Sequence, residues 1–394
     1  MSKRVLMKGN EVIAEAAIRA GCRYYFGYPI TPQTEIMHYM ALTMNKAGGT
    51  FVQAESEVAA INMVYGASAA GGRVLTSSSS PGISLKQEGF SYIAGAELPA
   101  VVVNIVRGGP GLGGILPAQG DYFQATKGGG HGDYRNIVIA PASIQELYEM
   151  TVEAFNLADK YRMLVMILGD GTLGQMMEPV SFREKEPIVI PEKPWALTGR
   201  KDREEHNTIQ SIYINPDDLE AKNIELQDKY KVVSRDEVRY EELNTEGAEI
   251  IIVAFGTCSR ICRNVIRQAS GIGIKVGMIR PITLWPFPTE VIAAAAARPC
   301  ATSARWPTVS PVTARCTCSW ATFISSARPT ATPPSISSAP WRPVFSTKTP
   351  AISSTSRAPR RSTTAVTSKR QGSISPPRSG SIRRRARRFS CSRP

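Results

Sequence analysis

The chain has 394 residues, enough for two or three domains with a buried core. Its hydrophobic content is 42% and its charged content is 20%, which is typical of a soluble globular protein. No apolar run is long enough to cross a bilayer and no signal-peptide pattern opens the sequence, so we expect a cytoplasmic protein without a membrane partner. The net charge of +14 by itself suggests a nucleic-acid binder.

The charges are divided unevenly along the chain. Residues 1–290 contain 29 Lys and Arg and all 33 Asp and Glu, a net charge of −4. Residues 291–394 contain 18 Lys and Arg and no acid, a net charge of +18. A mildly acidic body is therefore followed by a basic tail, and the two need separate interpretations.

The tail has the composition of an unfolded segment. From residue 299 to 394, 72 of 96 residues are Ala, Pro, Ser, Thr or Arg, without helical or strand periodicity. We expect residues 297–394 to be disordered. Three origins are open: a plain disordered extension, a cationic arm for phosphate backbones centred on residues 383–388, and a shifted reading frame in a GC-rich gene. We favour a frameshift near residues 294–299, because acids stop abruptly after Glu290 and frame-shifted GC-rich codons yield this composition.

Helical and strand patterns alternate along the body. The sequence at 9–25 places apolar residues near helical spacing with Gly21 as the stop, and the short apolar strand YYFGYP (24–29) follows. We predict a helix start at Thr31-Pro32, because proline suits the first helical turn and Glu35 suits the same turn. Next come a strand and the small-residue helix within FVQAESEVAAINMVYGASAAG (51–71).

Further apolar strands complete the first domain. They lie in RVLTSSSSPG (73–82), PAVVVNIVRGGPGLGG (99–114), NIVIAPAS (136–143) and MLVMILGDG (163–171), the last two separated by the helix SIQELYEMTVEAFNLADKY (143–161). Alternating strands and helices predict an α/β domain with a parallel sheet over residues 1–182. Ligands of such sheets bind at the carboxyl ends of the strands, where we expect Thr31, Glu57, Ser77–Ser80 and Arg107 to gather.

The pattern changes after Phe182. Residues 183–247 are polar and interrupted by proline, which predicts an extended linker. Residues 248–296 begin a second α/β domain with a strand, a helix and a strand. The remaining strands of that domain are expected after Glu290 and do not follow, so we interpret the domain as truncated.

Several motifs favour structural roles. The loop after Arg107 lacks the Gly-Lys-Ser/Thr ending of a phosphate-binding loop, and we interpret it as a tight turn. His131, in the glycine-rich run Lys127–Asp133, could act as a ligand or a base, but a single loop histidine is more often neither. Gly169-Asp170-Gly171 resembles the start of a thiamine-diphosphate metal motif but lacks the later Asn-Asn, so Asp170 is interpreted as a turn residue and no metal site is predicted. The body has no cysteine spacing for an iron–sulfur cluster, and free thiols fit a reducing cytosol.

Long runs of the body resemble a known family. The runs are GYPITPQTE (27–35), QAESEVAAINMVYGA (53–67), TSSSSPG (76–82), VNIVRGGPGLGG (103–114), KGGGHGDY (127–134) and RPITLWPFP (280–288). They resemble the alpha subunit of 2-oxoacid:ferredoxin oxidoreductases, most strongly the branched-chain type acting on 3-methyl-2-oxobutanoate (ketoisovalerate), with the 2-oxoglutarate type next. The resemblance covers residues 1–296 and ends close to where the acids end.

The resemblance implies a division of labour between subunits. Residues 1–182 are expected to bind the aminopyrimidine of thiamine diphosphate, and residues 248–296 resemble the start of the family's transketolase-C-terminal-like domain. A separate beta subunit would supply the diphosphate and Mg²⁺ domain and [4Fe-4S] clusters, with a gamma subunit and ferredoxin as further partners. The implied reaction is oxidative decarboxylation of a 2-oxo acid to acyl-CoA and carbon dioxide, with coenzyme A as co-substrate and electrons passing to ferredoxin.

The resemblance also implies site residues. Glu57 is expected to hydrogen-bond the pyrimidine ring and promote its imino tautomer, with Tyr28 and Pro29 also at the cofactor. Glu55 is the alternative, and both acids could be no more than helix N-terminal charges. Thr31 and Arg107 match substrate-contacting positions, where an arginine can hold the substrate carboxylate bidentately.

Two other classes stay open at this point. One is a nucleic-acid-associated protein that uses the basic tail, and the other is an inactive remnant with a truncated second domain. We expect no nucleic-acid partner, because the tail is interpreted as out of frame.

Overall fold

The computed structural model describes residues 4–184, 186–200 and 203–297, together with the backbone of residues 322–325. These segments all belong to one compact unit, residues 1–330. No helix among the described residues is both long and apolar enough to span a membrane.

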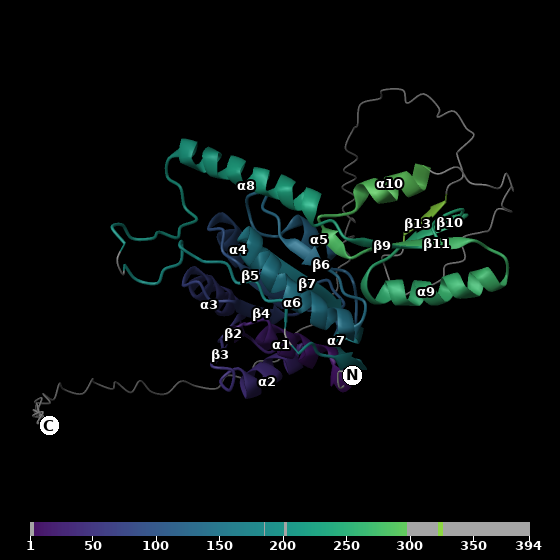
Figure 1. Cartoon of the computed structure of the whole chain (residues 1–394), viewed down its shortest axis with the longest axis horizontal. Coiled ribbons are helices and arrows are strands. Elements are labelled where there is room, and N and C mark those ends of the chain that lie inside the picture. Colours follow the sequence, from purple (N-terminus) through teal and green to yellow (C-terminus); the bar gives the residue numbers. More distant parts are fainter. Residues whose placement is uncertain (1–3, 185, 201–202, 298–321, 326–394) are drawn as a thin grey trace, which may run out of the picture. The chain divides into compact units, whose positions relative to one another are not determined.

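A seven-stranded sheet forms the centre of the first domain (Figure 1). Its order is β12-β6-β7-β5-β4-β2-β3, and every neighbouring pair is parallel except β12 with β6. The bounds are β12 (Thr283–Trp285), β6 (Ile137–Ile139), β7 (Leu164–Asp170), β5 (Ala100–Val106), β4 (Val74–Ser78), β2 (Tyr24–Gly27) and β3 (Thr50–Gln53). The predicted parallel α/β domain is confirmed.

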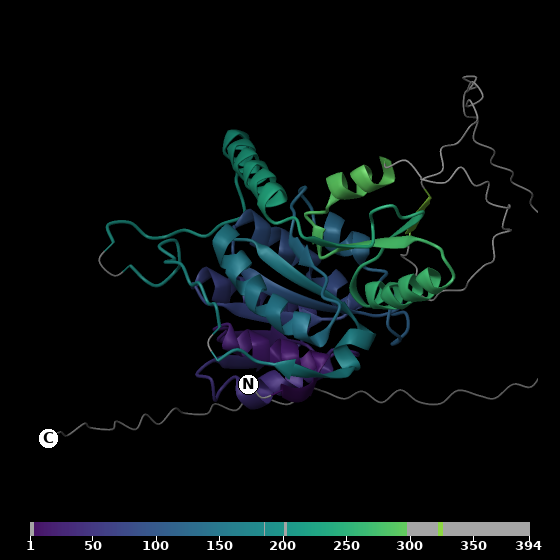
Figure 2. The ribbon, with the colours of Figure 1, turned by 45° about the vertical axis from the view of Figure 1, so that its right-hand side comes forward.

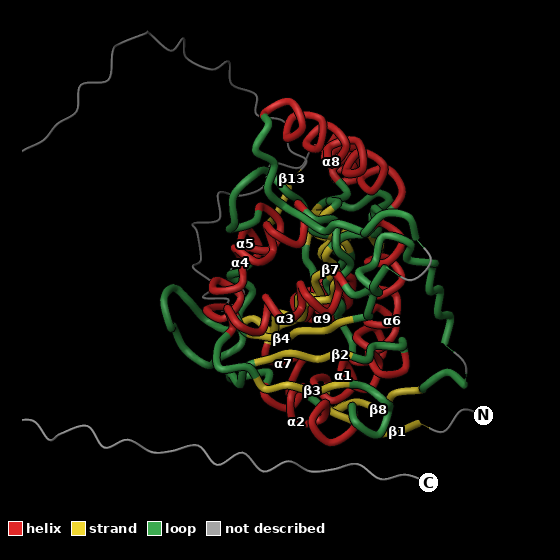
Figure 3. The backbone as a smooth tube through the Cα atoms, turned by 90° about the vertical axis from the view of Figure 1, so that its left-hand side faces the viewer, coloured by secondary structure: helices red, strands yellow, loops and turns green. Residues whose placement is uncertain are grey.

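Helices cover both faces of this sheet, as Figure 3 shows for β7 between α4 and α6. One face carries α1 (Gly9–Arg19), α2 (Thr34–Thr43) and α6 (Ile144–Tyr161), and the other carries α3 (Glu57–Ala69), α4 (Ser80–Gly95) and α5 (Tyr122–Lys127). Because strand side chains alternate between faces, Val101 and Val103 pack in the first core and Val102 packs in the second. Central strands buried on both faces explain the near-continuous apolar runs in the sequence.

The N-terminal strand closes the first domain from outside this sheet. β1 (Arg4–Lys8) pairs antiparallel with β8 (Met177–Ser181), which follows the short helix α7 (Gly171–Gln175). The sequence patterns did not predict this pair.

The predicted helix start at Thr31-Pro32 was wrong by two residues. Residues 31 and 32 form a turn with a cis peptide bond, Gln33 is the N-cap, and α2 begins at Thr34. The backbone N–H of Gln33 donates to the carbonyl of Ile30 at 3.0 Å, which closes the turn before the helix can begin.

The prediction of an extended linker over residues 183–247 was also wrong in its second half. Residues 216–236 form the 21-residue helix α8 (Pro216–Asp236), and β9 (Tyr240–Leu243) follows. Asn215 caps α8 by accepting from the backbone N–H of Asp217, and proline occupies the first turn. The helix is mostly polar because it buries little more than Leu226, Tyr230 and Val233.

A smaller sheet follows in the order β13-β10-β11-β9. β10 (Ile250–Val253) and β11 (Val276–Pro281) are parallel and joined by α9 (Gly256–Gly271), which confirms the predicted strand–helix–strand start. Helices α9 and α10 (Thr289–Ala297) pack against opposite faces (Figure 2). The chain then departs from the predicted domain boundary, because β12 leaves this sheet and joins the edge of the seven-stranded one.

The predicted disordered tail can be compared with the structure over four residues only. β13 (Thr322–Ser325) pairs antiparallel with β10, so the expectation of no regular structure is wrong there. The rest of the expectation, at 298–321 and 326–394, lies outside the described residues.

Candidate functional site

Arg107 and Thr31 meet at the carboxyl edge of the seven-stranded sheet. Arg107 follows β5, and its two terminal guanidinium nitrogens donate to the carbonyls of Thr31 at 2.9 Å and Leu112 at 3.0 Å. Its backbone N–H donates to the Ser80 hydroxyl at 3.0 Å. The structure therefore brings together three of the predicted positions, with the guanidinium fixing the glycine loop to the Thr31 turn.

Glu57 lies in the first turn of α3 and is buried, with 6% of its surface exposed, whereas Glu55 is exposed. Its carboxylate packs against Gly82 of α4 so closely that a Cβ at residue 82 would lie 2.6 Å from Glu57 Oε1. The same Cβ would lie 2.1 Å from the Ser78 hydroxyl. Of the two candidate glutamates, Glu57 is thus the one held inside the molecule, in a cradle that only glycine permits.

A chain of hydrogen bonds joins β2 and β4 to the turn before α2. The Ser77 hydroxyl donates to Gln33 Oε1 at 2.5 Å and also pairs with the Tyr25 hydroxyl at 2.7 Å. Gln33 Nε2 donates to the Tyr28 carbonyl at 3.3 Å, so the turn that carries the half-buried Tyr28 and Pro29 is tied to β4. Complete burial raises the pKa of Tyr25, which keeps the phenol neutral.

Lys86 is a fully buried amine that the sequence interpretation missed. Its Nζ donates to the Thr76 hydroxyl at 2.6 Å and to the Ser77 carbonyl at 3.1 Å. Burial lowers the pKa of Lys86 to about 7, and the negative charge of Glu57 acts in the opposite direction. A sequence signal existed, since Lys86 lies between Ile83 and Phe90 on the apolar face of α4.

Asn104 is a second polar residue that the sequence interpretation passed over. It lies within the buried strand β5, accepts from the backbone N–H of Ser80 at 3.1 Å and donates to Asp121 at 2.9 Å. Ser80 has a φ of 20°, an uncommon value for a non-glycine residue, and the Asn104 contact helps to hold it at the start of α4. A single asparagine in the apolar run PAVVVNIV was the available signal.

Several buried polar atoms at the carboxyl ends of β4 and β5 lack a hydrogen-bond partner among the described residues. They are the hydroxyls of Ser78 and Ser79 and the Nε of Arg107. Among the same residues, no hydrogen bond reaches the Glu57 carboxylate either. Buried polar groups are normally paired, so this arrangement suits a ligand with its own donors and acceptors.

Asp170 and His131 take structural positions. Asp170 Oδ1 accepts from the backbone N–H of Leu173 at 3.0 Å and so caps α7, which confirms its interpretation as a turn residue. His131 is exposed, and its carbonyl accepts from the Ser91 hydroxyl at 2.9 Å. Its loop is also anchored to α4 by the Gly129 N–H, which donates to the Gln87 amide oxygen at 2.9 Å.

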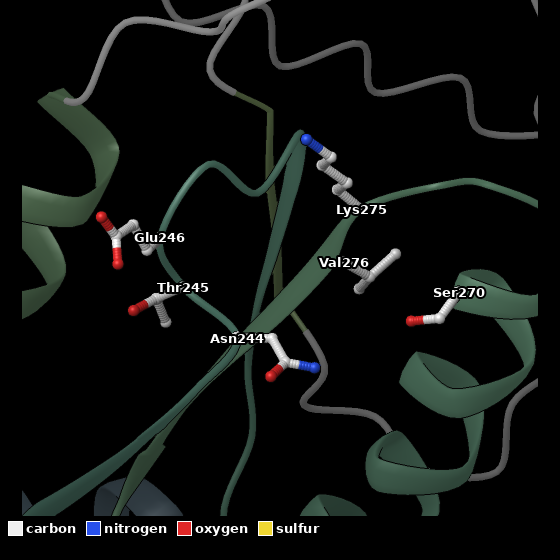
Figure 4. A pocket seen from close by; sticks show the side chains of 6 residues that line it. All are labelled: Asn244, Thr245, Glu246, Ser270, Lys275 and Val276. Atoms are coloured by element: carbon white, nitrogen blue, oxygen red, sulfur yellow. The ribbon is translucent and has the colours of Figure 1, made fainter.

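Two cavities are lined by residues other than those of the predicted site. One, of about 400 Å³, lies between residues 116–119, Asp170, Thr172 and the first turn of α9. The other, of about 550 Å³, is lined by Asn244, Thr245, Glu246, Ser270, Lys275 and Val276 and is shown in Figure 4. Neither cavity contains Glu57, Thr31 or Arg107.

Comparison with known proteins identifies related chains. Residues 15–243 match the family model "Pyruvate flavodoxin/ferredoxin oxidoreductase, thiamine diP-bdg", and residues 248–302 match "Pyruvate:ferredoxin oxidoreductase core domain II". The ketoisovalerate oxidoreductase subunit VorB of Methanothermobacter marburgensis is 55% identical over 287 residues, covering 73% of this chain and 81% of the relative. The 2-oxoglutarate synthase subunit KorA of Methanocaldococcus jannaschii is 36% identical over 308 residues, covering 73% and 84%.

A solved structure has the same fold. It is a 2-oxoglutarate:ferredoxin oxidoreductase from Magnetococcus marinus with 2-oxoglutarate, coenzyme A and succinyl-CoA bound, with a TM-score of 0.68 and 29% identity. The match covers 75% of this chain, which spans 56% of the length of that protein.

Proposed function

This chain belongs to the 2-oxoacid:ferredoxin oxidoreductase family, and we propose that it is the subunit that holds the pyrimidine half of thiamine diphosphate in an enzyme for branched-chain 2-oxo acids. The observation that carries the proposal is the buried, unpaired Glu57 in its glycine cradle. The substrate class rests on the ketoisovalerate relatives at 55% and 54% identity, against 36% and 37% for the 2-oxoglutarate relatives.

The cradle fits a polar heteroaromatic ring. A carboxylate without a protein hydrogen bond, near the unpartnered hydroxyl of Ser78, matches the donors and acceptors of an aminopyrimidine. Glu57 would hold a proton at the ring nitrogen, and Tyr28 and Pro29 would flank the ring. When bound, thiamine diphosphate supplies the carbanion and the electron sink for decarboxylation.

Arg107 and Thr31 are proposed to receive the substrate carboxylate. Both terminal nitrogens of Arg107 donate to backbone carbonyls, so the guanidinium is already oriented at the strand edge. Each terminal nitrogen also carries a second N–H, and these two donors are the ones proposed to bind the incoming carboxylate. Thr31 is exposed beside it and would define the position of the carboxylate.

The remaining parts of the enzyme are proposed to lie on other chains. Asp170 is used as a helix cap, so we assign Mg²⁺ and the diphosphate group to a beta subunit that also holds the [4Fe-4S] clusters. A gamma subunit and ferredoxin complete the complex, and coenzyme A accepts the acyl group. Leu112, Ile115 and Leu116, which are 80%, 65% and 75% exposed next to Arg107, would be covered by the beta subunit.

Activity of the assembled complex tests this function. The chain would be co-expressed with the beta and gamma subunits, and coenzyme A-dependent viologen reduction measured with and without thiamine diphosphate. We expect turnover with 3-methyl-2-oxobutanoate to exceed turnover with 2-oxoglutarate, and none from this chain alone. An assembled complex that is inactive with every 2-oxo acid, or that prefers 2-oxoglutarate, would contradict the proposal.

We also infer that the reading frame changes near residues 294–299. The absence of acids after Glu290 supports this inference, and the match to the second family model ends at residue 302. Sequencing the codons for residues 290–300 tests it. A frame that encodes an acid-free tail in the genomic DNA would refute a sequencing origin, and the complex assay would then report whether this copy is active.

A further inference from the structure

Lys86 is placed to act on Glu57 from the next turn of α4. Gly82, which contacts Glu57, precedes Lys86 by four residues, so both residues lie on the same face of α4. Side chains on a helix lean toward its N-terminus, which directs the Lys86 chain back along the turn of Gly82. The amine is fixed there by Thr76 Oγ1 at 2.6 Å and by the Ser77 carbonyl at 3.1 Å.

These two hydrogen bonds use two of the three N–H groups of the Lys86 ammonium group and leave the third unused. The charge that raises the pKa of Lys86, against the effect of burial, is that of Glu57 in α3. Among the described residues, the side chains of Lys86 and Glu57 form no direct ion pair, and no hydrogen bond joins them. The other titratable group near Ser77 is the Tyr25 hydroxyl of β2, which burial keeps neutral.

The loop at residues 127–134 contacts α4 through Gln87 and Ser91. Its Tyr134 hydroxyl donates to the Gln87 amide oxygen at 3.1 Å, and its His131 is exposed beside Ser91. On α4 itself, Glu88 accepts from Tyr92 at 2.5 Å on the exposed face of the helix. Lys86 and Glu57 are therefore a two-member charge cluster inside the first domain.

We propose that Lys86 is a positioning residue for Glu57, whose ammonium group orients the Glu57 carboxylate toward the ligand position. The use of this orientation rests on the proposed function, whereas the attraction between the two charges does not. The attraction acts across the interior around the fully buried amine, where it is less screened than in water. Burial also lowers the pKa of Lys86 to about 7, so the pairing of charges weakens as the amine loses its proton at higher pH.

A double-mutant cycle on the full chain tests the charge coupling without any cofactor. Lys86→Gln removes the positive charge and keeps a hydrogen-bond donor. Glu57→Gln removes the negative charge and keeps an oxygen that can accept. Unfolding equilibria of the four proteins would be compared at about pH 6 and about pH 9. We expect a coupling of about tenfold or more in the unfolding constant at the lower pH and a clear loss of it at the higher pH.

Two further variants keep the test decisive. Lys86→Met replaces Lys86→Gln if the glutamine variant does not fold, and Lys46→Gln, at an exposed lysine, is the matched control and should show no coupling to Glu57. A coupling below about twofold at both pH values, or one of equal size at both, overturns the proposal.

Cofactor affinity separates this proposal from the proposed function. Calorimetry of thiamine diphosphate binding to the assembled complex should change between about pH 6 and pH 9 in the wild type. Lys86→Arg, which stays charged, should remain at the value of the lower pH, and Lys86→Gln at the value of the higher pH. A wild-type complex that binds no thiamine diphosphate refutes the proposed function alone, whereas binding by both variants with the wild-type pH dependence refutes the role of Lys86.

Discussion

The close approach of Ser78 and Glu57 to Gly82 predicts that one added methyl group at residue 82 lowers the stability of the protein. In Gly82→Ala the new Cβ would lie 2.1 Å from Ser78 Oγ, 2.6 Å from Glu57 Oε1 and 2.9 Å from Glu57 Cγ. Ordinary contacts at such a carbon are about 3.4–4 Å, so the Glu57 carboxylate must move by roughly 1 Å. Overpacking of this kind destabilises proteins by about 1–3 kcal/mol.

Gly66→Ala is the matched control. Gly66 lies within α3, and a Cβ there would meet nothing within 4 Å. Replacing a glycine inside a helix by alanine stabilises it by about 1 kcal/mol. We therefore expect the free energies of unfolding of the two variants to differ by about 1–4 kcal/mol, with Gly82→Ala the less stable.

Denaturant unfolding of the two full-length variants measures this difference, and thiamine diphosphate binding by the assembled complex measures the displacement of Glu57. Gly82→Ala should weaken cofactor binding, and Gly66→Ala should leave it unchanged. If Gly82→Ala is as stable as Gly66→Ala and binds the cofactor like the wild type, Glu57 is not held against residue 82 and the cradle is incorrect.

Four other changes have expected outcomes. Arg73→Met should lower the free energy of unfolding by about 1–3 kcal/mol in denaturant titrations, because the buried hydrogen bonds of the guanidinium to Asp159 and Ala20 are lost while Lys193 still pairs with Asp159 at 2.6 Å. Glu57→Gln should reduce viologen reduction by the complex about 10²–10⁴-fold with the fold intact by circular dichroism. Asp170→Asn should retain the α7 cap and activity, and Asp170→Ala should cost about 1 kcal/mol in thermal unfolding; a loss of Mg²⁺ binding in the asparagine variant would contradict the cap assignment. Because the folded pKa of Lys86, about 7, lies below its ordinary value of 10.5, stability from this residue rises with pH between those values, and Lys86→Met should remove that rise, up to about 5 kcal/mol, in urea titrations.

The main sheet was predictable because its strands are buried on both faces. Runs such as PAVVVNIV and MLVMILGDG have no polar face, and helical spacing between them indicates crossovers. Helix α8 was not recognised, because it buries few side chains and its sequence is mostly polar, without a clear apolar stripe. The departure of β12 to the first sheet could not be predicted, since a three-residue strand carries no information about which sheet it joins.

The site was predictable to the level of residue types and not of contacts. The choice of Glu57 over Glu55 followed from a resemblance, and burial now supports it through the cradle at Gly82. The interactions of Arg107 with two backbone carbonyls are long-range and leave no periodic trace. Lys86 was overlooked because an isolated lysine in a helix is usually solvated, and only the position of the core shows that this one is not.

Buried charges in this chain serve two different ends, and their hydrogen bonds distinguish them. Arg73 and Asp159 are closed off: the guanidinium also donates to the carbonyls of Ala20 and Val189, and Lys193 takes the second carboxylate oxygen at 2.6 Å. These ion pairs and hydrogen bonds fasten the segment near residue 190 to the first domain. Glu57 is buried to a similar degree and accepts no hydrogen bond from any described residue. Its carboxylate therefore keeps hydrogen-bonding capacity for a ligand at the carboxyl edge of the sheet.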